Sequence, residues 1–107
     1  MDHKYIFDPS TRYMTRGISE QVPIELQLFM WNEIDKVVKA EKVDYLQVFE
    51  FKVKDGYLEV EHRQEVPVYK KIHKLILLDG YQVLDKVKIF VIDNTPSHST
   101  MLLASEY

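Results

Sequence analysis

Histidine and carboxylate side chains are the residues of this chain that could carry acid–base or metal chemistry. There are seventeen aspartates and glutamates and four histidines, at His3, His62, His73 and His98. No two histidines lie three or four residues apart, and neither H-E-x-x-H nor D-x-D-x-D-G occurs, so the spacing indicates no metal site. The absence of cysteine excludes thiolate chemistry, and three glycines are too few for a phosphate-binding loop. A G-x-S-x-G elbow is also missing. We therefore expect no metal, no cofactor and no catalytic motif.

A set of polar residues interrupts stretches that otherwise have the pattern of buried faces. A buried polar group without a hydrogen bond costs roughly 1–3 kcal/mol, so these side chains must satisfy one another, reach the solvated rim, or face a ligand. The first candidate site is therefore a polar pocket of a hydrolase or small-molecule-binding protein centred on His62, and the alternative is a frayed strand end in water. The set comprises Gln47, His62, Gln64 and Glu65, together with Gln27 and Glu33.

Basic residues near two tyrosines form a second candidate site. Cations neutralise phosphates and aromatic rings stack on bases, so such a patch predicts binding of single-stranded nucleic acid. The net charge of −3 disfavours this interpretation, and solvated strand faces with ordinary charges are the simpler one. The basic residues are Arg12, Arg16, Lys70, Lys71 and Lys74, and the tyrosines are Tyr13 and Tyr69.

A third candidate site is a protein interface on a predicted helix. Leu26 and Phe29 widen the apolar arc of this helix beyond half its circumference, and Trp31 lies in its main stripe. Trp31 fits a core position, but the wide arc favours a helix that packs on a sheet and also meets a partner.

The helix that carries this arc is predicted from about Ile24 to Glu41. Pro23 suits the first helical position, and no further Pro or Gly follows within the segment. An angle of about 100° per residue places the main apolar residues in one stripe. The stripe consists of Ile24, Leu28, Trp31, Ile34 and Val38, flanked by Met30 and Val37.

A β-hairpin positions most of the polar set. Residues 43–54 and 57–67 flank Asp55-Gly56, a pair favoured in two-residue type I′ turns. This turn predicts a register that places Phe51 opposite Val60 and Phe49 opposite His62. The same register continues to Gln47 opposite Gln64 and Tyr45 opposite Val66, and it sets Lys52 across from Glu59, Val48 across from Arg63 and Glu50 across from Glu61.

Further strands are predicted at residues 11–18, 69–78, 86–93 and 100–104, with residues 19–22 as a connection. Asp79-Gly80 and residues 94–97 supply breaks, and residues 1–10 are predicted to be loose. The order of one helix followed by hairpin-connected strands predicts an α+β fold, with the helix on one face of a mostly antiparallel sheet of five or six strands.

Length and composition predict one domain spanning all 107 residues. An apolar content of 46% is ample for a single core. The first residues lack the apolar run of a signal peptide, and no stretch of about 18 apolar residues occurs. We expect a cytoplasmic protein that does not contact a membrane.

Several sequence blocks together resemble a known family. The blocks are RYMTRGI from Arg12, PIELQLFMW from Pro23, DYLQVFE from Asp44, QEVP from Gln64 and the ending MLLASEY from Met101. They are similar to short proteins of unknown function from staphylococci, enterococci and related low-GC Gram-positive bacteria. The resemblance implies a bacterial cytoplasmic protein carried on phage or plasmid elements, and it brings no activity or catalytic residue with it.

Three hypotheses for function follow from the sequence. The first is a non-enzymatic module for protein–protein interaction, with self-association through a sheet edge or the helix as one form. The second is a weak binder of single-stranded nucleic acid, and the third is an enzyme or small-molecule-binding protein with a pocket around His62.

Overall fold

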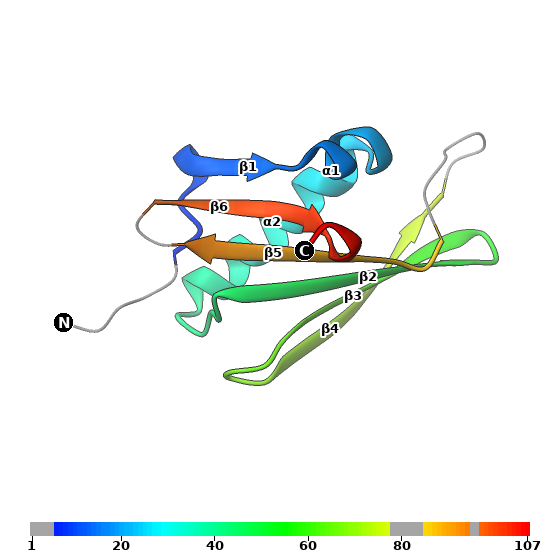
Figure 1. The fold of residues 1–107 in the computed structure, drawn as a ribbon. Helices are drawn as coiled ribbons and strands as arrows, with labels where there is room; N and C mark the ends of the chain where they lie inside the picture. The colour runs from blue at the N-terminus through cyan, green and yellow to red at the C-terminus, as the bar shows by residue number, and fades with distance from the viewer. Residues whose placement is uncertain (1–5, 78–84, 95–96) are drawn as a thin grey trace.

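The computed structural model describes residues 6–77, 85–94 and 97–107 as one helix-covered sheet (Figure 1). Six strands have the order β1-β6-β5-β2-β3-β4, and every neighbouring pair is antiparallel except β1 with β6. The predicted α+β class is confirmed. The elements are η1 (Pro9–Thr11), β1 (Arg12–Met14), α1 (Arg16–Gln21), α2 (Ile24–Lys39), β2 (Leu46–Lys54), β3 (Tyr57–Gln64), β4 (Tyr69–Ile76), β5 (Val87–Asn94), β6 (His98–Leu103) and η2 (Ala104–Glu106).

The helix α2 follows Pro23, which is its N-cap rather than its first helical residue as predicted. The predicted stripe was wrong in its orientation, because Ile24 and Leu28 are 53% and 61% exposed. The buried face is rotated from it by roughly one residue step, about 100°. This rotation brings Gln27 and Glu33 into the interior, where the sequence pattern indicated polar residues on a buried face. The buried residues are Leu26, Gln27, Met30, Glu33, Ile34 and Val37.

The β2–β3 hairpin has the predicted register, from Lys54 opposite Tyr57 to Val48 opposite Arg63. The backbone ladder ends there, before the predicted pairs of Gln47 with Gln64 and of Tyr45 with Val66. The side chains of Gln47 and Gln64 are nevertheless neighbours, joined by a hydrogen bond of 2.6 Å. The turn is not type I′, because that type needs positive φ at both central residues and only Gly56, at 83°, has it. Arg63 lies between Glu50 and Glu61, at 3.1 and 2.7 Å, and relieves their predicted repulsion.

The N-terminal third differs most from the sequence prediction. Residues 16–21 form α1, whereas residues 11–18 were predicted as a strand and residues 19–22 as a connection. Thr15 caps α1 by accepting a hydrogen bond from the Ile18 amide. Phe7 is fully buried, and its amide donates to the buried Asp93 at 3.2 Å, so the chain is docked at Phe7 although a loose segment was predicted over 1–10.

The C-terminal 3₁₀ helix holds the start of α1. The Glu106 carboxylate accepts hydrogen bonds from the amides of Gly17 and Leu103 and from the Thr15 hydroxyl. These bonds, that from Thr15 first, lower the pKa of Glu106. A Cβ on Gly17 would lie 2.7 Å from this carboxylate, so a larger residue there would require the Glu106 side chain to shift.

The remaining strands are close to their predicted ranges, and the predicted turn at Asp79-Gly80 lies outside the described residues. The core lies between α2 and the sheet, where Met30 and Ile34 pack with Phe49, Phe51 and other buried residues of the strands. Within the described ranges, no helix combines the length and apolarity needed to cross a membrane.

Replacement of Phe7 tests whether the N-terminal segment is part of the core. We expect Phe7→Ala to lower the free energy of unfolding by about 3 kcal/mol, because it empties a fully buried aromatic site. Urea denaturation followed by Trp31 fluorescence measures this loss. The half-exposed neighbour gives a control, since Ile6→Ala should change the value by less than about 1 kcal/mol. Equal values for both variants would contradict the docking of Phe7.

Candidate functional site

Three of the predicted pocket residues form one buried hydrogen-bonded network. Gln47 Nε2 donates to Gln64 Oε1 at 2.6 Å and to the Asp44 carbonyl at 2.9 Å. This fixes Gln47 Oε1 toward His62, whose Nε2 lies 2.7 Å away and must therefore carry the donated proton. Gln64 Nε2 donates to the carbonyls of Lys42 and Pro67, at 2.6 and 2.8 Å. The network closes the end of the hairpin by bonding its own polar groups to one another.

His62 lies between aromatic rings in the interior of the sheet's helix-covered face. Its ring stacks on Phe49 with centroids 4.3 Å apart and forms a T-shaped contact with Tyr69, with centroids 5.2 Å apart. Burial lowers the pKa of His62 to about 4. The Glu33 charge opposes this shift, and His73 adds to it, both to a smaller extent. The imidazole is therefore neutral near pH 7, with a bare Nδ1 that has no hydrogen-bond partner among the described residues.

A buried carboxylate lies beside this network, on the face of α2 turned to β4. Glu33 accepts a hydrogen bond from Lys36 at 2.8 Å, and its other oxygen lies 3.2 Å from His73 Nε2. That second contact has ion-pair distance without hydrogen-bond alignment, so neither atom has a hydrogen-bond partner within the described part of the chain. Burial lowers the pKa of His73, whereas burial and the Glu33 charge raise the pKa of Tyr69.

The other two predicted pocket residues do not join the network. Gln27 is buried at the opposite side of α2, where it donates to the Val22 carbonyl at 2.8 Å, and Glu65 is exposed in the turn after β3. The hydrogen-bonding groups of Gln47 and Gln64 are used within the fold. Across the described ranges, no three His, Asp or Glu side chains are arranged to hold a metal ion.

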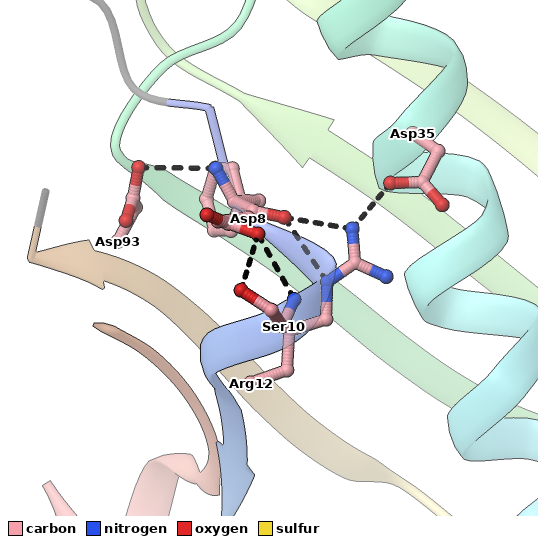
Figure 2. Close-up of polar contacts among 6 residues, drawn as sticks. Asp8, Ser10, Arg12, Asp35 and Asp93 are labelled. Carbon is pink, nitrogen blue, oxygen red and sulfur yellow. Dashed lines mark hydrogen bonds and ion pairs between the residues drawn. The ribbon is translucent and has the colours of Figure 1, made fainter. Parts of the chain in front are cut away.

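The predicted basic patch is divided between the two edges of the sheet. Arg12 lies in β1 and Arg16 begins α1, whereas all three lysines lie on β4 at the opposite edge. Figure 2 shows the Arg12 guanidinium bonded to the Asp35 carboxylate. Its Nη2 also donates to the Phe7 carbonyl at 2.8 Å. The guanidinium also lies 4.6 Å from the Trp31 ring centroid. Arg12 thus joins the N-terminal segment to α2 and is not available for phosphate.

The predicted interface residues separate in a similar way. Trp31 lies beneath Arg12 on the β1 side of α2. Leu26 and Phe29 instead line an apolar groove of about 310 Å³ between α2 and the edge of the sheet. Its other lining residues are Glu25, Leu58, Leu75, Ile76 and Leu77.

The edge strand β4 is the surface that sequence analysis missed. Among the described strands it pairs with β3 alone, and Ile72 and Ile76 on it are 51% and 85% exposed. Val66 and Val68, just before it, are exposed as well. The available signal was that every second residue from Lys70 to Ile76 is alternately lysine and isoleucine. A strand's position at an edge, however, depends on the pairing of the whole sheet.

The direction of the backbone groups of β4 follows from the hairpin. In antiparallel pairs, residues that exchange hydrogen bonds alternate with residues that do not. Lys54 and Tyr57 close the two-residue turn and exchange hydrogen bonds, so the next pair, Val53 and Leu58, does not. In agreement, the Val53 amide donates to the Asp85 side chain. Leu58, Val60 and His62 therefore bond to β4, through Leu75, His73 and Lys71. The amides and carbonyls of Lys70, Ile72 and Lys74 consequently point to the free edge.

Hydrogen exchange tests this alternation. In the free protein we expect fast exchange at the Ile72 and Lys74 amides and slow exchange at Lys71 and His73, because only the latter bond to β3. Residue-resolved exchange by NMR measures the four rates. Uniform protection along β4 would contradict a free edge.

The pH dependence of stability tests the burial of His62. Its pKa of about 4 lies below the unfolded value of 6.5, so the unfolded state binds more protons between these values. The free energy of unfolding must therefore fall as pH falls through this range. When the pH is lowered from near 7 to near 5, we expect the free energy of unfolding of His62→Gln to fall by about 2 kcal/mol less than that of the wild type. Urea denaturation at both pH values measures the difference, and equal losses, or an NMR titration midpoint near 6.5, would contradict a buried neutral His62.

Comparisons with known proteins place the fold among bacterial proteins of unknown function. No curated protein matches the chain. The crystal structure of a protein of unknown function from Enterococcus faecalis has a similar fold, with a TM-score of 0.75, 24% sequence identity and coverage of 100% of this chain and 98% of that one. Residues 11–106 match the family described as staphylococcal protein of unknown function (DUF960). The chain therefore belongs to the DUF960 family, as the sequence blocks from Arg12 onward implied.

Proposed function

We propose that this protein is a non-enzymatic interaction module that binds an extended segment of another protein along β4. The observation that carries the proposal is the edge of this eight-residue strand, which pairs only with β3 among the described strands. There, Lys70, Ile72 and Lys74 direct their backbone groups away from β3. An extended chain placed beside such an edge gains main-chain hydrogen bonds along its length. β4 is long enough to hold a segment of several residues.

The groove beside β4 supports the same function. The edge strand forms one wall through Leu75 and Ile76, and α2 forms the other through Leu26 and Phe29. Successive side chains of an added strand alternate between the two faces of the sheet, so every second one lies on the α2 side. One of these can enter the groove, and main-chain bonds would then supply affinity while the groove selects an apolar side chain.

The polar cluster gives less support to a hydrolase. A general acid or base must reach the proton that it transfers in the substrate. His62 is fully buried, donates to Gln47 and is enclosed by Phe49 and Tyr69. Its arrangement is suited to stabilising the fold.

Binding of single-stranded nucleic acid also has weaker support. A phosphate-binding patch needs several cations close together. Arg12 is committed to Phe7, Asp35 and Trp31, and it lies across the sheet from the lysines of β4.

A proline in the free edge tests the proposed function. The Ile72 amide points away from β3, so Ile72→Pro should leave the fold intact while removing one edge donor. Peptides that bind the wild type can be selected from a random displayed library. We expect them to bind Ile72→Pro at least about tenfold more weakly, because proline removes an edge hydrogen bond and distorts the extended backbone. Fluorescence anisotropy measures the affinities.

Two comparisons make the proline result specific. Ile72→Thr keeps the amide and the strand preference, so it should retain binding within about threefold. When a selected peptide is added to the wild type, the amide chemical shifts should change more at Ile72 and Lys74 than at Lys39 on α2. This measurement does not depend on whether the proline variant folds. Failure to enrich any peptide, or equal binding to the wild type and Ile72→Pro, would refute binding along β4.

A further inference from the structure

Resting on the proposed function, we infer that the segment bound at β4 is acidic at one end and apolar at the other. It carries glutamate or aspartate opposite Lys70 and Lys71 and an apolar side chain opposite Leu75, where the groove opens. Its occupant is a segment of a different protein, not a second copy of this chain.

The first support is the charge of the edge itself. β4 contains three lysines and no acidic residue, although the whole chain has a net charge of −3. On the open face, Lys70 lies 3.7 Å from Glu61 of β3, and Lys74 lies 5.3 Å from the centre of the Tyr57 ring. On the α2 face, Lys71 is exposed. Opposite charges directly across a strand pair are stabilising, so this edge favours carboxylates on an added strand.

The second support is the change of character along the strand. Lys70 and Lys71 lie at the start of β4, whereas Leu75 and Ile76 lie at its end and line the groove. The lining of the groove is mainly apolar, with Leu26, Phe29 and Leu58 beside these two residues. A bound segment therefore has its acidic residues near the start of β4 and its apolar residue near the end.

A second copy of this chain fits the edge poorly. If two β4 strands paired antiparallel about a twofold axis centred on Lys71, the two Lys71 residues would lie opposite each other. Centring the axis on Ile72 places Lys70 opposite Lys74 instead. Like charges directly opposite are destabilising, and lysines on an edge strand oppose pairing between identical edges. The same lysines attract an acidic strand.

A designed peptide tests the inference. Antiparallel to β4, the sequence Thr-Leu-Glu-Thr-Val-Glu-Glu-Thr places leucine opposite Leu75, valine opposite Ile72 and glutamates opposite all three lysines. We expect the acetylated and amidated peptide to bind the wild type, and its version with glutamine for glutamate to bind about tenfold more weakly. Fluorescence anisotropy at low and moderate salt measures both, and only the glutamate peptide should weaken with salt.

Protein variants assign the charge effect to the edge. Lys71→Gln should weaken binding of the glutamate peptide about threefold and leave that of the glutamine peptide unchanged. Lys39→Gln removes an exposed lysine from α2 and should alter neither. Replacing the peptide's leucine with glutamate should weaken binding, because it removes the apolar side chain that faces the groove.

The outcomes separate this inference from the proposed function. If library peptides bind in a manner sensitive to Ile72→Pro but are not enriched in acidic residues, the edge binds segments and the acidic assignment is wrong. If neither the designed nor any selected peptide binds, the proposed function fails as well. If removal of all three lysines causes dimerisation, by light scattering, without any loss of peptide affinity, the lysines only prevent self-pairing and the inference is overturned.

Discussion

The register of the β2–β3 hairpin is the constraint on which the rest of the structure depends. Residues of a strand alternate between faces, so fixing Lys54 opposite Tyr57 sends Phe49, Phe51, Leu58 and Val60 toward α2. The same register directs the backbone groups of β3 toward β4, and thereby leaves those of Lys70, Ile72 and Lys74 at the open edge. A shift by one residue would expose the core and also change which amides an added strand could reach. Core and candidate binding edge thus have one common origin.

The buried polar cluster is stable because most of its groups bond to one another. Gln47, Gln64 and His62 exchange hydrogen bonds, and Glu33 has Lys36 at hydrogen-bonding distance. Burial holds His62 neutral, since an uncharged imidazole loses little on leaving water. The cluster is also consistent with the observed orientation of α2. In the predicted orientation, rotated by about 100°, Glu33 would face solvent, away from His73, and the buried Met30 would be exposed.

The lysines of β4 can serve two purposes through one interaction. Repulsion between like charges opposes pairing of two identical edges, and attraction to carboxylates favours an acidic strand from elsewhere. In the proposed complex, the apolar groove beside Leu75 would add selectivity at one end of the strand. Protection against self-association and choice of partner are therefore compatible properties of this edge.

The sequence by itself determined the α+β class, the α2 segment and the hairpin register, because periodicity and the Asp55-Gly56 turn are local signals. It also identified Gln47, His62 and Gln64 as polar residues on an apolar face. Only the tertiary structure decided that they bond to one another, that Arg12 joins Phe7 to Asp35, and that β4 forms an edge. Each of these depends on which distant segments become neighbours, and a one-dimensional pattern contains no such information.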